Sequence, residues 1–379
     1  MFDQRAFLDD LRTVVNIDSN SYYPEGLLEV GNEYAKIAER FGLKVTRHKL
    51  SDQTGELLEI TNHGITDRYD VLMMGHMDTV QPVGTVKVRP YSEDERCAYG
   101  PGISDMKSGT LSALYAYNAL PEEVKQKLNI CILMNPDEEI TSRYSRPYTH
   151  DIAKKTDYAF VLEASNHLNT YTNRRKGSGT YKIKFHGVPG HSGYIFDNFT
   201  ANAVVEMANW ATALHALNNR ETLLSVNVAT ANGGTAANVV PEFCEMIVNI
   251  RVVTKDQYDY FEGKLAELKA HPFIEGVNTE IEIISKNYPM VPVPEMDEWI
   301  ERIRKTLRSI GQDLILYPIR GGCSDGNVIA DAGTRVIDSI GPMSKGGHTN
   351  HEELYLDKIE PCIDRLVALI CEICEYEKK

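Results

Sequence analysis

Short, uninterrupted apolar runs that alternate with helical segments constrain the fold of this chain more than any other feature. A strand that is apolar at every position is buried on both faces, as in a mostly parallel sheet covered by helices. Such runs occur at 70–75, 129–135 and 158–163. Amphipathic or apolar helical segments occur at 27–41 and 107–120. This part of the chain therefore predicts an α/β domain.

The strand pattern changes near Ser178. The segments 180–187, 223–230, 243–251 and 279–285 alternate apolar and polar side chains, which is typical of a sheet with one solvated face. Helical segments at 199–217 and 256–270 separate them in the order of a split βαβ, ferredoxin-like unit. Helical and buried-strand patterns return at 296–310 and 335–340. We therefore predict an α/β domain formed by 1–177 and 290–379, with an α+β domain, 178–289, inserted into it.

Charge and cysteine usage narrow the class of protein. The 40 Lys and Arg residues against 54 Asp and Glu residues leave a net charge of −14, which argues against binding nucleic acid or an anionic membrane. No apolar run approaches the roughly 18–20 residues that span a bilayer, and the chain starts with acidic residues where a signal peptide would be basic. The seven cysteines are scattered among apolar neighbours, as reduced thiols are. We expect a cytoplasmic protein.

Potential metal ligands follow the predicted buried strands, at the edge where open α/β sheets bind ligands. His76 and Asp78 follow the first run and point the same way on an extended chain. A neutral histidine is a good zinc ligand, and a carboxylate can hold its other ring nitrogen. Glu138 and Glu139 follow the second run, and Glu163 ends the third. A solvated acidic turn is the alternative for the two adjacent glutamates.

Two further segments add ligands of the same kind. Asp105 follows a Gly-Pro-Gly loop and precedes a helix, so it is either an N-cap or a carboxylate able to bridge two ions. His348 and His351 follow two glycines, and either could be a ligand. The whole set offers nitrogen and oxygen ligands without thiolate, which favours two zinc ions, or cobalt or manganese, over a structural zinc finger.

The motifs, in this order, resemble those of the di-zinc peptidase family that includes carboxypeptidase G, acetylornithine deacetylase, succinyl-diaminopimelate desuccinylase, peptidase T and aminoacylase. The resemblance is carried by GHMDTV at 75–80, GPGISDMKSG at 100–109, PDEE at 136–139 and GGHTNHEE at 346–353. It extends over nearly the whole chain and looks closest to carboxypeptidase G. It implies a three-layer zinc-exopeptidase domain that carries a ferredoxin-like lid through which two subunits dimerise.

The resemblance also implies a role for each ligand. His76 and Glu163 would bind one zinc, Glu139 and His348 the second, and Asp105 both. The spacing of His348 to the following glutamates matches the family pattern, which favours it over the second histidine of that segment. Relatives usually have a cis peptide after the bridging aspartate, so we expect one between Asp105 and Met106.

Further roles would fall to residues that do not bind metal. Asp78 would orient the histidine beside it, and Glu138 would be the general base. His191, in GVPGHSGY, resembles the histidine that reaches the partner subunit's active site and polarises the scissile carbonyl. Asn238 and Arg251 resemble the groups that hold the substrate carbonyl and carboxylate.

Some positions depart from the family. Tyr288 stands where glutamate-releasing relatives have arginine, which weakens the case for a C-terminal glutamate as substrate. Asn249 stands where many relatives have aspartate. The segment IRGGCSDGN resembles a glycine-rich segment of peptidase T, which makes Arg320 a second candidate for the substrate carboxylate.

The sequence thus predicts a di-zinc amidohydrolase, with two Zn²⁺ ions per subunit that Co²⁺ or Mn²⁺ could replace. We expect a carboxypeptidase that releases a C-terminal amino acid from a short peptide or N-acyl amino acid. An N-acyl-amino-acid deacylase and an aminotripeptidase are the alternatives within the family, and a non-catalytic binding protein is the remote one. We also expect a homodimer formed through residues 178–289.

Overall fold

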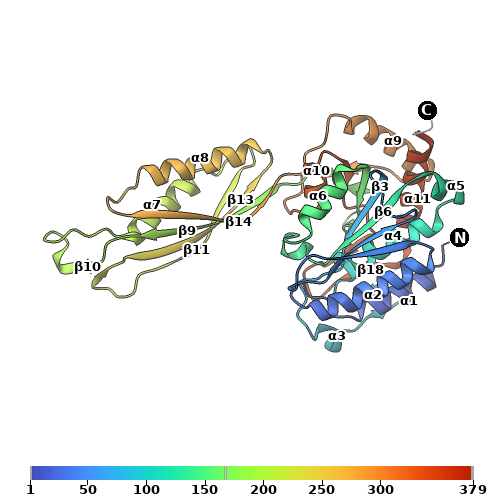
Figure 1. Cartoon of the computed structure of the whole chain (residues 1–379), viewed down its shortest axis with the longest axis horizontal. Helices are drawn as coiled ribbons and strands as arrows, with labels where there is room; N and C mark the ends of the chain where they lie inside the picture. The colour runs from blue at the N-terminus through green and yellow to red at the C-terminus, as the bar shows by residue number, and fades with distance from the viewer. Residues whose placement is uncertain (1, 166, 168, 377–379) are drawn as a thin grey trace. The chain divides into compact units, whose positions relative to one another are not determined.

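The computed structural model describes residues 2–165, 167 and 169–376, and the contacts divide the chain into two compact units (Figure 1). The first unit comprises Met1–Arg174, Pro292–Ile319 and Ser324–Lys379. The second comprises Arg175–Val291 together with the short segment Arg320–Cys323. The segment 178–289 lies within the second unit. Arg320, which the sequence placed in the larger domain, packs with the second unit.

A six-stranded sheet in the order β1-β2-β6-β3-β7-β16 forms the centre of the first unit. Its strands are β1 (Lys44–Lys49), β2 (Glu56–Thr61), β6 (Ile130–Asn135), β3 (Tyr69–His76), β7 (Thr156–Val161) and β16 (Arg335–Ile337). The last four are parallel, and β2 is antiparallel to both of its neighbours. The three predicted apolar runs are the central strands β6, β3 and β7, which explains why they lack polar alternation. Strand β7 ends two residues before Glu163.

Helices cover this sheet on both faces. The helices of this unit are α1 (Gln4–Val15), α2 (Pro24–Arg40), α3 (Thr85–Val88), α4 (Ser108–Ala119), α5 (Glu122–Lys127), α6 (Arg146–Lys154), α9 (Met296–Ser309), α10 (Asp325–Asp331) and α11 (Ile359–Tyr376), of which the short α3 buries no side chain. Side chains of α1, α2, α4, α9 and α11 share one buried cluster with one face of the strands. Helices α6 and α10 pack on each other and on β7 outside that cluster. The predicted α/β architecture is therefore confirmed, and it has three layers.

A small four-stranded sheet joins segments that are distant in the sequence. Its order is β17-β18-β5-β4, with β17 (Ser344–Lys345), β18 (Glu353–Tyr355), β5 (Cys97–Tyr99) and β4 (Ser92–Glu93). Glu353 of β18 is paired with Tyr99 of β5. The end of the loop that precedes β18 therefore lies beside the start of the loop that follows β5. These loops carry His348 and Asp105.

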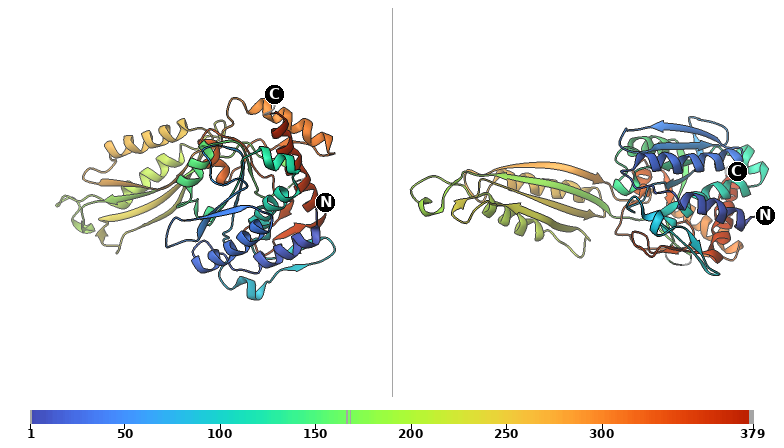
Figure 2. Two further views of the ribbon diagram at one scale, coloured as in Figure 1. Left: turned by 45° about the vertical axis from the view of Figure 1, so that its right-hand side comes forward. Right: turned by 90° about the horizontal axis from the view of Figure 1, so that it is seen from below.

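The second unit contains a four-stranded antiparallel sheet in the order β11-β13-β9-β14. The strands are β9 (Gly177–His186), β11 (Ser225–Gly233), β13 (Phe243–Val252) and β14 (Asn278–Asn287), with helices α7 (Ala203–His215) and α8 (Asp256–Ala270). The two helices lie on one face of this sheet (Figure 2). Alternate residues of β9 are buried and pack against Trp210 of α7 and Phe261 of α8. The order of elements is that of the split βαβ unit. The alternation in sequence thus corresponds to one covered and one solvated face.

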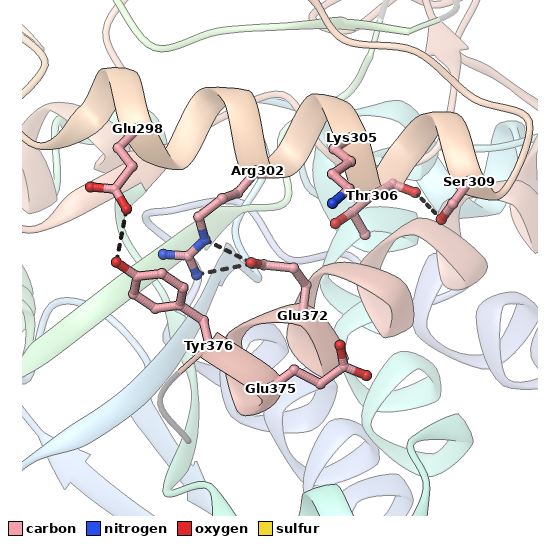
Figure 3. Close-up of a pocket in the computed structure, with 8 residues that line it drawn as sticks. All are labelled: Glu298, Arg302, Lys305, Thr306, Ser309, Glu372, Glu375 and Tyr376. Carbon is pink, nitrogen blue, oxygen red and sulfur yellow. Dashed lines mark hydrogen bonds and ion pairs between the residues drawn. The ribbon is translucent and has the colours of Figure 1, made fainter. Parts of the chain in front are cut away.

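A surface hollow of about 460 Å³ separates α9 from α11 in the first unit (Figure 3). The guanidinium of Arg302 donates to Glu372 at 2.6 Å and lies 3.3 Å from the centre of the Tyr376 ring. The Tyr376 hydroxyl donates to Glu298 at 2.8 Å. These contacts fasten the two helices together, and none of the predicted site residues lines the hollow. In the described part of the chain, no helix is long and apolar enough to cross a membrane.

Candidate metal centre

His76, the last residue of β3, is fully buried and held in one orientation. Its Nδ1 lies 2.9 Å from the carbonyl oxygen of Asp78 and 3.3 Å from Oδ1 of the same residue. Its Nε2 lies 3.1 Å from Oδ1 of Asp105 and 3.8 Å from Oε1 of Glu163. When Nδ1 carries the proton and donates it in a hydrogen bond to Asp78, the unprotonated Nε2 faces the carboxylates of Asp105 and Glu163. A metal-binding histidine is held in the same way.

Asp105 lies in the Ile103–Lys107 turn that precedes α4, and its peptide bond to Met106 is cis, as the sequence predicted. The alternative role as an N-cap is wrong, because the N-cap of α4 is Lys107. The second oxygen of Asp105, Oδ2, lies 3.2 Å from Nε2 of His348. One carboxylate thus faces two histidines through its two oxygens. Burial would raise the pKa of Asp105, but its bonds with His348 and His76 outweigh burial and lower it.

Glu138 and Glu139 form one short helical turn after β6, and Asp78 holds its backbone. The two oxygens of Asp78 accept the backbone N–H groups of Glu138 and Glu139, each at 3.1 Å. The hydroxyl of Ser21 donates to the same carboxylate at 2.7 Å. Because the backbone is fixed in this way, the two adjacent glutamates point in different directions.

The two glutamates have different surroundings. Glu139 places Oε2 3.0 Å from Nε2 of His348, whose bonds to Asp105 and Glu139 raise its pKa to about 10. Burial raises the pKa of Glu138 well above the usual range, and the charges of Glu163, Asp325 and Glu139 add to the effect although His76 opposes it. Glu138 therefore holds a proton more readily than an exposed glutamate does.

The donor set fits a divalent metal ion. Ligand atoms of His76, Asp105 and Glu139 lie within 4.8 Å of one another. The Oε1 atom of Glu139 is buried and has no hydrogen-bond partner among the described residues, which leaves a lone pair free for an ion. The concentration of carboxylates around two imidazoles favours a cation at the same place. Neutral imidazole and carboxylate ligands suit zinc, cobalt and manganese.

His351 does not share this environment. Its side chain makes no ion pair with these carboxylates in the part of the chain that the structure describes. The histidine that faces Asp105 and Glu139 is His348, whose backbone is left-handed with φ of 64°.

A buried pair, Glu352 and Gln81, clamps the loops that carry the ligands. Oε1 of Glu352 accepts the N–H of Gly102 at 3.0 Å and Nε2 of Gln81 at 2.8 Å, and Oε2 accepts the N–H of Ser104 at 3.1 Å. Gln81 also donates to the carbonyl oxygen of Thr349 at 3.1 Å. The clamp therefore fixes the residues next to Asp105 and to His348.

The sequence did not indicate these supporting residues. Ser21 and Gln81 lie outside the motifs that carry the predicted ligands. Glu352 was the better marked of them, since it lies within the motif at 346–353. A residue that holds a loop in place can be at any distance in the sequence from its hydrogen-bond partners, so no motif marks it.

The four other predicted residues lie in the second unit. His191 is in β10 (Gly190–His191), paired with β12 (Val239–Val240), and the N–H of Ser192 donates to the carbonyl oxygen of Asn238 at 3.0 Å. Arg251 lies near the end of β13, with Nη1 3.9 Å from Sγ of Cys323. The structure therefore places His191 beside Asn238, and Arg251 beside the segment that starts at Arg320.

Comparison with known sequences yields a family match over most of the chain. A model described as Peptidase family M20/M25/M40 matches residues 72–372. The chain is 25% identical over 359 residues to carboxypeptidase G2 from Pseudomonas sp. (strain RS-16), a match that covers 94% of this chain and 86% of that protein. It is 27% identical over 305 residues to a succinyl-diaminopimelate desuccinylase from Thioalkalivibrio sulfidiphilus, which covers 76% of this chain and 79% of that protein.

Solved structures share the fold. The aminopeptidase PepT from Bacillus cereus superimposes with a TM-score of 0.79 at 19% identity, covering 98% of this chain and 99% of that chain. An M20 family metallo-carboxypeptidase from Sulfolobus solfataricus superimposes with a TM-score of 0.74 at 18% identity, covering 97% and 99%.

We predict that Glu352→Gln weakens zinc binding roughly 10–100-fold, the usual effect of losing a residue that orients metal ligands. The amide cannot accept all three hydrogen bonds that the carboxylate accepts. The loops that carry Asp105 and His348 are then no longer held in a fixed position. Zinc competition with a chromophoric chelator measures the change. The matched control is Glu353→Gln, whose carboxylate accepts the hydroxyl of Tyr355 instead. Equal zinc affinity in the two variants would show that the clamp does not shape the site.

Proposed function

The chain belongs to peptidase family M20/M25/M40, and we propose that it is a co-catalytic zinc carboxypeptidase acting on short peptides or N-acyl amino acids. Membership makes it a metallohydrolase of peptide or amide bonds, in agreement with the resemblance found in the sequence. The observation that carries the proposal is the Asp105 carboxylate, which lies between His76 and His348. The cysteines are free thiols, in line with the proposed cytoplasmic location.

We assign two Zn²⁺ ions to each subunit, with Co²⁺ or Mn²⁺ as possible substitutes. His76 and Glu163 would hold one ion and His348 and Glu139 the other, with Asp105 shared between them. When bound, such a pair of ions acidifies a water molecule and polarises the scissile carbonyl. The donor atoms already face a common centre, which supports this assignment.

The catalytic proton transfers belong to Glu138 in this proposal. Asp78 fixes both the tautomer of His76 and the backbone of Glu138, so that the base and the metal ligand share one anchor. The Glu138 carboxylate accepts the proton of the attacking water and later delivers it to the nitrogen of the leaving amine. Burial raises its pKa, which supports this double role because a more basic carboxylate takes up a proton more readily.

We predict that Glu138→Gln keeps its metal ions but loses turnover. The amide is nearly isosteric but cannot accept a proton, and general base catalysis contributes about 10²–10⁴-fold. Metal analysis of the purified variant, together with its kcat, measures both effects. The comparison variant is Glu139→Gln, which should lose a metal ion. Loss of an ion from Glu138→Gln, or near wild-type kcat, would reverse the roles of the two glutamates.

Arg251 and Arg320 support the choice of a carboxypeptidase. An arginine fork binds a carboxylate through two parallel hydrogen bonds, and Arg251 lies beside the segment Arg320–Cys323. The names of two relatives, carboxypeptidase G2 and a metallo-carboxypeptidase, agree with this choice. A deacylase is the alternative in view of the desuccinylase relative, and an aminotripeptidase in view of PepT.

We predict that Arg251→Ala lowers kcat/KM about 10–100-fold for a dipeptide with a free C-terminal carboxylate. The lost charge-assisted hydrogen bonds are worth about 1.5–3 kcal/mol. The C-terminal amide of the same dipeptide is the control, because it offers no carboxylate to lose. An equal loss on the acid and on the amide would exclude Arg251 as the carboxylate-binding group.

The length of the four-stranded sheet in the second unit supports the proposed homodimer. Phe243, at the start of β13, is paired with His186, whereas Arg251 is paired with Ser178 at the opposite end of β9. The strand rise of about 3.4 Å per residue separates these ends by roughly 27 Å. His191 and Asn238 precede the start of β13, and Arg251 lies near its end. If all three bind one small substrate, as we propose, they come from two chains that dimerise through 178–289.

We predict that two inactive variants restore activity when they are refolded together. In a mixed dimer of Glu138→Ala and His191→Ala, one site combines an intact Glu138 with an intact His191 from the other chain. Random pairing makes about half of the dimers mixed, so about a quarter of all sites should work. Activity is measured after co-refolding in equal amounts, with each variant refolded alone as the control. Heterodimers that form without activity, or a fully active monomer, would exclude action across the interface.

A further inference from the structure

The turn that presents Glu138 and Glu139 is followed by two non-glycine residues with left-handed backbone. Thr141 has φ of 71° and Ser142 has φ of 50°. Residues with a Cβ atom avoid this region, and two in succession are held there only where the surroundings impose it. The Thr141 side chain is exposed, so its own packing does not impose the conformation. The constraint must come from Ser142 and its neighbours.

Asp325 supplies the constraint from a distant part of the chain. Its Oδ1 accepts the hydroxyl of Ser142 at 2.6 Å, and its Oδ2 accepts Nδ2 of Asn135 at 3.0 Å. Asn135 is the last residue of β6, and Ser142 follows the turn. One carboxylate therefore holds both ends of the loop that contains Glu138 and Glu139. Asp325 is only 2% exposed, so water competes little for these bonds.

The carboxylate itself is held rigidly. Asp325 is the first residue of α10, where the helix dipole favours a negative charge. Ser324 caps this helix by accepting the N–H of Gly326 at 3.0 Å, and its own N–H donates to Asn327 at 3.0 Å. Helix α10 packs on α6, which begins shortly after Ser142. The loop is thus tied to a packed pair of helices.

Asp137 closes the turn locally, through its backbone and its side chain. Its side chain accepts the N–H groups of Tyr144 and Ser145, at 2.6 and 3.2 Å. Its carbonyl oxygen accepts the N–H of Ser142 at 2.8 Å. The backbone bond spans the turn, and the side-chain bonds hold the residues after it. The Asp325 carboxylate adds a tie between Ser142 and Asn135, the last residue of the strand before the turn.

We propose that Asp325 is a positioning residue, whose carboxylate holds Asn135 and Ser142 so that Glu138 faces the scissile amide and Glu139 faces its metal ion. The inference rests on the proposed function, because it concerns the presentation of the general base. Asp325 acts through its bonds to Asn135 and Ser142, and in the described part of the chain it makes no hydrogen bond to Glu138 or Glu139. Without it, Thr141 and Ser142 relax toward right-handed backbone, and the two glutamates lose their alignment. A displacement of about 1 Å in such a site can cost about 10²-fold in rate.

The first test is Asp325→Asn, which keeps the shape but turns one acceptor into a donor that faces Asn135. We expect kcat to fall about 10–100-fold with KM changed less than about twofold, and zinc affinity to fall about 10-fold. Ser142→Ala should give a smaller loss of the same kind, and it serves as the second variant if Asp325→Asn does not fold. The matched control is Asp331→Asn at the other end of α10, which should match the wild type.

The second test is rescue by glycine. Thr141→Gly removes the steric penalty of the left-handed backbone, and the exposed side chain that it removes has no packing role. The double variant Asp325→Asn with Thr141→Gly should have a kcat at least about threefold higher than that of Asp325→Asn. Thr141→Gly alone should have the kcat of the wild type. Wild-type kcat and zinc affinity in Asp325→Asn would overturn the proposal, and so would a loss that Thr141→Gly does not reduce.

A readout without substrate separates this inference from the proposed function. Hydrogen exchange of the backbone amides at 138–142 should accelerate in Asp325→Asn and not in Asp331→Asn. If the wild-type protein hydrolyses no amide, the proposed function fails, while amide exchange and zinc affinity still decide the role of Asp325. Unchanged exchange at 138–142 in Asp325→Asn would overturn that role.

Discussion

Repulsion among closely spaced carboxylates is the constraint on which the candidate site of the larger unit depends. Asp78, Asp105, Glu138, Glu139 and Glu163 converge at the end of the central strands, where a lone buried charge is costly. Backbone N–H groups neutralise Asp78, two histidines face Asp105, and burial shifts Glu138 toward its protonated form. The charge that remains favours metal cations. The proposed acid–base role of Glu138 and the proposed metal binding thus have one electrostatic origin.

Three buried carboxylates, one of them Asp78 itself, maintain this arrangement. Asp78 holds the N–H groups of the two glutamates, Glu352 holds the loop before Asp105, and Asp325 holds both ends of the Glu138–Glu139 loop. Loops lack the regular hydrogen bonds of helices and strands, so their precision has to come from side chains. Hydrogen bonds to a charged group contribute about 1.5–3 kcal/mol each, roughly twice as much as neutral ones. A carboxylate with two oxygens can also join two segments at once.

In the second unit the limiting factor is the distance between the predicted substrate-binding residues, not their charge. Its antiparallel strands separate the pair His191 and Asn238 from Arg251 by about the length of β13. A long, regular sheet cannot bring both ends to one small molecule. The proposed dimer resolves this geometry, since one chain would supply the first pair and the other chain the arginine. The exchange experiment with Glu138 and His191 tests this division of labour.

The sequence by itself predicted the elements whose buried side chains recur at a regular spacing along the chain. Unbroken apolar runs marked β3, β6 and β7, alternating runs marked the split βαβ unit, and clustered ligands marked the segments that the structure gathers around Asp105. Tertiary structure alone decided which side chains meet: the pairing of β18 with β5, the clamp of Glu352 and Gln81, the packing of Arg320 with the second unit, and the reach of Asp325 to Ser142. Periodic burial acts on neighbouring residues and leaves a pattern in the sequence. A hydrogen bond between residues 183 positions apart depends on the folded path of the chain and leaves none.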